Sequence, residues 1–178
     1  KKTYAPYHLS FKDFILGRVD TTKLPPAQAN LVKDLAAQIV DAHKRIVKAF
    51  EAECNGQWEK LVEQDYPRLQ LTTHLNGAKV YKKLVDLLTE GDEHIKWAET
   101  KEKKEETYAG YLNDLTYVWE YAERERDYGL ATRCMLIESS IHSLASNIPP
   151  HLLAELAKTG RWNYARCLSM IQQKSDDN

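Results

Sequence analysis

The sequence has few of the residues that separate the strands of a β-protein. Its 178 residues include only 7 glycines and 6 prolines, and these gather between segments of regular spacing rather than within them. A β-sandwich or barrel needs turn residues roughly every eight to twelve positions. The scarcity of such residues therefore favours helices joined by short turns.

An excess of charge of one sign is also missing. The chain carries 25 basic and 26 acidic residues, a formal net charge of −1. Proteins that bind nucleic acid through its phosphates normally show a basic excess or a basic stripe, so we do not expect a nucleic-acid partner. The densest charge run, residues 101–106, alternates in sign, and this pattern predicts a solvated helix surface.

Long apolar runs and paired cysteines are absent as well. No apolar segment approaches the roughly 18 residues that span a bilayer, so we expect no membrane partner. No two of the three cysteines, Cys54, Cys134 and Cys167, stand at metal-ligand spacing, and no secretory signal is visible. We therefore expect reduced, buried thiols in a cytoplasmic protein.

The motifs of common enzyme classes do not occur. The sequence contains no glycine-rich phosphate loop, no G-x-S-x-G nucleophile turn, no H-E-x-x-H and no Cys-x-x-Cys. The sequence therefore predicts a protein that is not an enzyme and has no catalytic residue, cofactor or metal. One alternative is a small helical ribonuclease, in which Arg68 would hold a phosphate and His74 would move a proton.

The remaining histidines suggest no firm site. His43 lies on the apolar stripe of a predicted helix, where a hydrogen-bonded core histidine is the expected interpretation. His142 and His151 flank a turn but lack a third metal ligand.

Residues 27–53 show the clearest helical period. Apolar side chains recur there at spacings of three, four or seven over about seven turns, at Leu31, Leu35, Ile39, Ile46 and Phe50. Pro25 and Pro26 suit the first turn of this helix, and Asn55-Gly56 is typical of a left-handed helix end.

Further segments of helical spacing follow, each bounded by turn residues such as Asn76-Gly77. Their aromatic residues, among them Trp97, Tyr108 and Trp119, are expected to pack between helices. Turns of two to five residues make sequential helices antiparallel neighbours, and the repeat length is not constant. The sequence therefore predicts an all-α, irregular antiparallel helical array, α-solenoid-like, with about nine helices. We expect a short helix after Ser10 and one near Trp97, and others over residues 57–64, 66–75, 78–88, 107–124, 128–146, 151–158 and 162–171.

Several stretches resemble bacterial NACHT-type STAND signalling ATPases. Residues 7–15 are similar to the "H-x-S-F-x-x-F" segment of the winged-helix region of that family. Residues 129–133, 137–141 and 143–150 together resemble a helical segment that follows the ATPase core in that family. In the family an "S-S-I-x-S-L-A-x-N-I-P-P-x-L-L" run leads into "L-x-x-x-G-x-W", and residues 156–162 match this continuation. Residues 42–46 and 66–75 are similar to two elements that lie between these stretches.

This resemblance implies a role. It divides the chain into a remnant of the winged-helix region at residues 1–20, a helical array at 21–174 and a frayed tail at 175–178. Family members hold ADP in a closed state, and His8 stands where the family places a histidine against the β-phosphate. The chain lacks the phosphate loop, so His8 would bind a cofactor only within a full ATPase.

The expected function is a non-catalytic helical regulatory or relay module of a STAND-type ATPase, in bacterial signal transduction or defence. Its partners would be proteins or adjacent domains of a larger parent chain. The alternative from a different class is a free-standing helical adaptor that binds another protein.

Overall fold

The computed structural model describes residues 20–175. His8, the short helix expected after Ser10 and nearly all of the expected winged-helix remnant at residues 1–20 lie outside the described residues. The same holds for residues 176–178 of the expected tail.

The described part of the chain is built from helices, and no strand occurs in it. The prediction of an all-α array of about nine helices is therefore confirmed. The elements are η1 (Thr21–Lys23), α2 (Pro26–Cys54), η2 (Trp58–Glu63), α3 (Asp65–Gly77), α4 (Tyr81–Thr89), α5 (Gly91–Glu105), α6 (Ala109–Glu125), α7 (Tyr128–Asn147), α8 (Pro150–Lys158) and α9 (Tyr164–Ser175).

Most helix ends follow the local signals in the sequence. Proline opens α2 and α8 at positions where no amide hydrogen is needed. Asn55 ends α2 in the left-handed conformation, with φ of 51°. The Asp127 side chain caps α7 by accepting a hydrogen bond of 3.0 Å from the amide of Leu130.

Three local predictions need correction. The segment at 57–64 forms a 3-10 helix rather than an α-helix, and the helix around Trp97 is longer than expected. Asn76-Gly77 does not stop its helix, because α3 continues through Gly77 and the left-handed residue is Lys79, with φ of 58°. Gly77 instead serves packing, since a Cβ atom there would lie 2.6 Å from the His43 ring.

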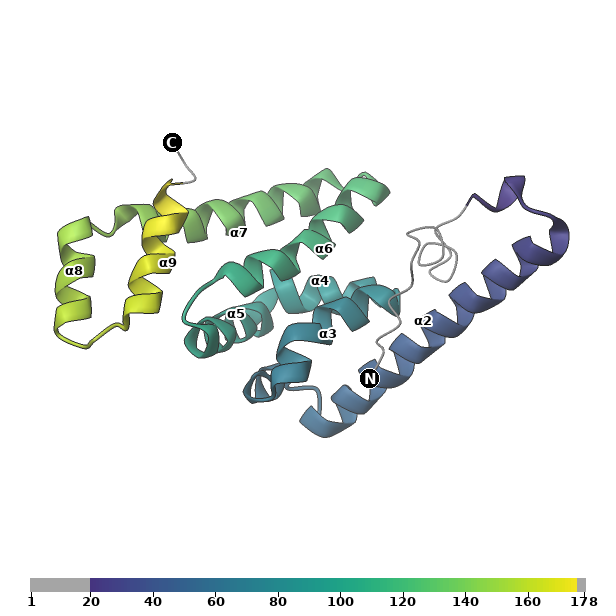
Figure 1. Cartoon of the computed structure of the whole chain (residues 1–178), viewed down its shortest axis with the longest axis horizontal. Coiled ribbons are helices and arrows are strands. Elements are labelled where there is room, and N and C mark those ends of the chain that lie inside the picture. The colour runs from purple at the N-terminus through teal and green to yellow at the C-terminus, as the bar shows by residue number, and fades with distance from the viewer. Residues whose placement is uncertain (1–19, 176–178) are drawn as a thin grey trace, which may run out of the picture.

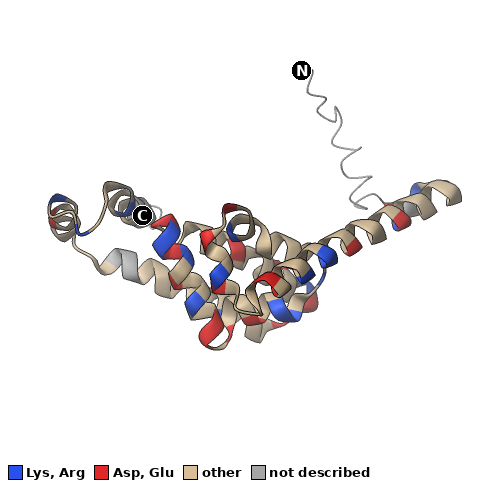
Figure 2. Cartoon of the chain, turned by 90° about the horizontal axis from the view of Figure 1, so that it is seen from below, with Lys and Arg blue, Asp and Glu red and all other residues tan. Residues whose placement is uncertain are grey.

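The helices form an elongated array with α2 at one end and the α8–α9 hairpin at the other (Figure 1). In the second view α2 projects from the central body (Figure 2). The main core joins α2 through α7 and includes Trp97, Leu84 and Val118, each with no exposed surface. A smaller core inside the α8–α9 hairpin contains Leu153 and Met170. All three cysteines are buried and free, as predicted.

The prediction of a solvated face at residues 101–106 is wrong for two of its members. Lys101 is 1% exposed and Glu102 7% exposed. The Lys101 ammonium donates to Asp114 of α6 at 2.5 Å, and Asp114 also accepts a hydrogen bond of 2.8 Å from the Thr72 hydroxyl of α3. Lys101 and Asp114 are both buried, and a charged side chain is tolerated in the interior only when it is paired. This cluster ties α3, α5 and α6 together at the centre of the array.

Candidate functional site

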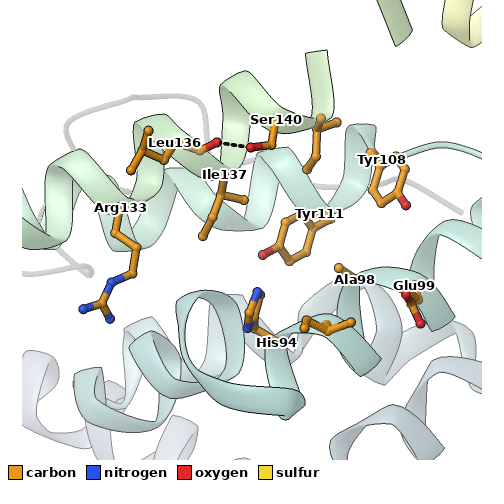
Figure 3. Close-up of a pocket in the computed structure, with 11 residues that line it drawn as sticks. His94, Ala98, Glu99, Tyr108, Tyr111, Arg133, Leu136, Ile137 and Ser140 are labelled. Atoms are coloured by element: carbon orange, nitrogen blue, oxygen red, sulfur yellow. Dashed lines mark hydrogen bonds between the residues drawn. The ribbon is translucent and has the colours of Figure 1, made fainter. Parts of the chain in front are cut away.

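An apolar depression lies between α5 and α7, and we call it the α5–α7 groove. Both helices pack against α6, and their adjacent flanks leave a space of about 360 Å³. Figure 3 shows the α5 side chains below and the α7 side chains above, with Tyr111 of α6 and Tyr108, which precedes α6, between them. The α5–α7 groove is lined by His94, Ile95, Ala98, Glu99, Tyr108, Tyr111, Arg133, Leu136, Ile137, Ser140 and Ile141.

The spacing of these residues explains how two helices make one groove. On α7 the lining positions recur at three and four residues, which is one stripe of an α-helix. Ala98, Tyr111 and Ile141 are buried at its base. Ile95 and Leu136 remain 46% and 63% exposed on the opposite flanks. The groove therefore presents large apolar side chains to solvent on two facing helices.

Four of the polar side chains around the groove have partners within the protein, whereas Glu99 and the Tyr108 hydroxyl have none among the described contacts. Tyr111 donates its hydroxyl hydrogen to the Leu88 carbonyl at 2.6 Å, and burial raises the pKa of this phenol far above its usual range. The Ser140 hydroxyl donates to the Leu136 carbonyl at 2.7 Å, as drawn in Figure 3. Arg133 pairs with Glu90 at 2.6 Å, and the Nδ1 of His94 donates to the Gly91 carbonyl at 2.6 Å.

This arrangement is suited to binding apolar side chains rather than to proton or phosphate chemistry. A helix about 10 Å wide that rises 1.5 Å per residue fills roughly 120 Å³ per residue. The 360 Å³ of the groove therefore accommodates a few side chains of a helix lying across it, not the helix itself. Apolar anchors from one helix face entering such a groove are a common mode of protein recognition.

A second cluster of polar groups joins α2 to α3. The Nδ1 atoms of His43 and His74 are 2.8 Å apart, and the Tyr66 hydroxyl lies 2.8 Å from the Nε2 of His74. Phe50 stands edge-on to the His74 ring. In the contact between the two Nδ1 atoms one ring donates and the other accepts. The two rings therefore cannot both be fully protonated at the same time. The prediction that His43 is hydrogen-bonded is confirmed, but the residue is only half-buried and is not part of the core.

Acid should weaken the packing of this cluster. Burial, and then the neighbouring His43, lowers the pKa of His74 below its usual value of 6.5. As the pH falls below 6.5, the unfolded chain takes up a proton at His74 before the folded chain does. The free energy of unfolding should therefore fall in that range, while above it this contribution is constant.

Urea unfolding from about pH 7.5 to about pH 5.5 tests this pH dependence. A His74→Gln variant has no proton to take up at this position, so its unfolding free energy should vary less over the same range. Equal slopes for the two proteins would contradict the assignment to His74.

The structure does not bring Arg68 and His74 together. Positions six apart on a helix differ by about 240° around its axis. Arg68 accordingly pairs with Asp65 at 2.9 Å and with Glu105 of α5 at 3.4 Å, whereas His74 contacts α2. Burial raises the pKa of the Glu105 carboxyl, an effect that Lys101 and Arg68 oppose. Arg68 is thus part of a structural ion-pair cluster and does not converge on the histidine.

The other histidines are also separate. The Nε2 of His142 is 3.9 Å from Glu138 of its own helix, and His151 is exposed at the start of α8. Among residues 20–175 no group of three or more metal-ligating side chains occurs. Within the same range no helix combines the length and apolar character needed to cross a bilayer.

Sequence reasoning did not find the α5–α7 groove. Leu136 stands off the apolar stripe that buries Leu130, Cys134 and Ile141. Ile95 lies in the segment near Trp97, for which the sequence predicts a helix but no apolar face. A large apolar residue outside the core stripe was the available signal, but isolated exposed apolar residues are normal on protein surfaces.

The chain was also compared with known proteins. No protein-family model, no curated protein and no solved structure matches it.

Proposed function

We propose that this chain is a non-catalytic helical regulatory or relay module of a STAND-type signal-transduction ATPase. In this role it mediates protein–protein or interdomain contacts and acts in the cytoplasm, in bacterial signalling or defence. The α5–α7 groove is the observation that supports it best. Its base is mostly apolar, Ile95 and Leu136 are exposed on its flanks, and the hydroxyls of Tyr111 and Ser140 are paired within the protein.

The position of α7 suggests how binding would be transmitted. This helix packs on α6 in the central body and on α9 in the terminal hairpin. Arg166 of α9 also pairs with Glu102 of α5 at 2.6 Å and stacks on Trp162 at 4.3 Å. A partner helix lying across the groove, with a few of its side chains between α5 and α7, would therefore bias the placement of α8–α9 relative to the body.

We propose a STAND-type ATPase as the parent protein because of the sequence resemblance to that family. The stretch at 143–150 that carries much of the likeness spans the end of α7 and the start of α8. It thus lies on the path from the groove to the terminal hairpin.

A charge placed on the groove should alter nucleotide exchange in the parent ATPase. Leu136→Glu adds a carboxylate at a position that is 63% exposed, so folding should be little affected while an apolar partner is repelled. We expect the release rate of a fluorescent ADP analogue to change by about fivefold or more, the lower range of allosteric coupling.

Met135→Glu is the matched control for this experiment. Met135 is 52% exposed on the same helix but does not line the groove. The Met135→Glu protein should therefore release the ADP analogue at the same rate as the unmodified parent. Equal rates for all three proteins would refute the relay role. If no nucleotide-binding module exists in the same polypeptide, the free-standing adaptor takes its place.

A further inference from the structure

A second hollow lies toward the opposite end of the array, between α2 and α6. Its volume is about 890 Å³, and we call it the α2–α6 cleft. The buried residues Val47, Phe50 and Cys54 anchor the C-terminal part of α2, while the helix projects beyond the body (Figure 2). The cleft is lined by Lys33, Ala36, Ala37, Ile39, Val40, Asp41, His43 and Lys44 of α2, by Asn76, Gly77, Lys79 and Tyr81, and by Tyr117, Glu120, Tyr121 and Arg124 of α6.

The shape of the cleft fits a helical segment. Lys33, Ala37, Val40 and Lys44 recur along α2 at spacings of three and four, so they form one stripe. Ala37, at the middle of this stripe, leaves room for the side chains of another helix. At roughly 120 Å³ per residue of helix, the cleft volume of about 890 Å³ corresponds to about two helical turns.

An aromatic surface formed by α4 and α6 lines one side of the cleft and carries a cation. The rings of Tyr81 of α4 and Tyr121 of α6 stack with centroids 4.4 Å apart. The Arg124 guanidinium lies 4.7 Å from the Tyr81 ring and 5.3 Å from the Tyr121 ring. Arg124 is therefore held in place at the cleft with its charge retained.

The charges around the cleft are unequal. Its lining includes the cations Lys33, Lys44, Lys79 and Arg124 but only two carboxylates, Asp41 and Glu120. Asp41 is engaged with Lys44 at 3.8 Å. Within the described residues, Lys33 and Lys79 have no acidic side chain at ion-pair distance. The cleft thus offers two unpaired cations to an incoming ligand.

We propose that the α2–α6 cleft binds an acidic helical segment, about two turns long, of a partner protein. Carboxylates on its flanks would pair with Lys33 and Lys79, and its apolar face would lie between Ala37 and Tyr121. The first 19 residues of this chain contain four lysines or arginines and one aspartate, so their net positive charge disfavours them as the occupant. Charge complementarity of this kind governs partner choice and association rate.

Three dye-labelled helical peptides test the proposal against the full chain. They share the same apolar residues and carry Glu, Gln or Lys at the flanking positions, and fluorescence anisotropy gives the Kd of each. We expect the Glu peptide to bind about tenfold more tightly than the Gln peptide, and the Lys peptide to bind least. Amide NMR shifts should move at Ala37 and Tyr117.

Charge reversal identifies the residues responsible. The double variant Lys33→Glu/Lys79→Glu should invert the order of the three peptides. Lys96→Glu, at an exposed lysine of α5 outside the cleft, should leave the order and the affinities unchanged. The Leu136→Glu variant of the α5–α7 groove should also bind the Glu peptide normally, so the two proposals can fail separately.

Several results would overturn the inference. These are no binding of the Glu peptide, equal affinities for the Glu and Gln peptides, or the same loss of binding with Lys96→Glu as with the double variant. Shifts confined to the α5–α7 groove would equally show that the cleft is not the binding site.

Discussion

Replacing Asp114 by alanine is expected to lower the free energy of unfolding by about 3–5 kcal/mol. Asp114 is 3% exposed and Lys101 is 1% exposed. The substitution would leave the buried Lys101 ammonium without a carboxylate, with the Gly110 carbonyl 3.3 Å away as a hydrogen-bond acceptor and the Trp97 ring 5.8 Å away. It would also remove the acceptor of the Thr72 hydroxyl. Urea denaturation followed by circular dichroism measures the loss.

A surface ion pair provides the matched control for Asp114→Ala. Lys104 pairs with Glu63 at 2.7 Å, but the two side chains are 39% and 72% exposed. Lys104→Met should therefore cost less than about 1 kcal/mol. A double variant, Lys101→Met/Asp114→Leu, replaces the buried pair by apolar side chains and should recover most of the stability lost in Asp114→Ala. If Asp114→Ala proved no more costly than Lys104→Met, the buried pair would have no special role in the fold.

Replacing Gly77 by alanine is expected to destabilise the protein by about 1–3 kcal/mol, the usual cost of an overpacked interface. The added Cβ would lie 2.6–2.7 Å from three atoms of the His43 ring, so the ring must move. That movement would break the 2.8 Å contact between His43 and His74 that joins α2 to α3. Thermal and urea unfolding both report the change.

Two further variants separate the steric effect from helix propensity. Gly129 lies near the start of α7, where an added Cβ meets only the Asp127 carboxylate at 3.4 Å. Gly129→Ala should therefore stabilise the protein by up to about 1 kcal/mol. In the double variant His43→Ala/Gly77→Ala the clash is absent, so the added cost of Gly77→Ala should disappear. A Gly77→Ala protein as stable as the unmodified one would show that the two helices are not packed as described.

Both predictions concern residues whose environment the local sequence misrepresents. Lys101 belongs to a run of alternating charges, which predicts solvation. It also lies one turn after Trp97 on α5, and Trp97 has no exposed surface, so the same face of the helix is carried into the core. Asp114 lies 13 residues away. A pairing over that separation depends on how α5 and α6 cross, which a local pattern does not encode.

The positions of most helices were determined by the sequence alone. Apolar side chains repeated at helical spacing, and prolines and Asn55 marked boundaries that the structure retains. These signals act within a few residues, because hydrogen bonds and caps of a helix are local. The scarcity of glycine and proline likewise sufficed for the fold class.

The tertiary structure alone decided which residues meet. His43 and His74 are 31 residues apart, and the walls of the α5–α7 groove and of the α2–α6 cleft come from helices distant in sequence. Their contacts follow from the angles at which amphipathic faces pack, and many angles satisfy the same sequence pattern. The helices could therefore be predicted one at a time, whereas the buried ion pair and both candidate binding surfaces exist only once the helices are assembled.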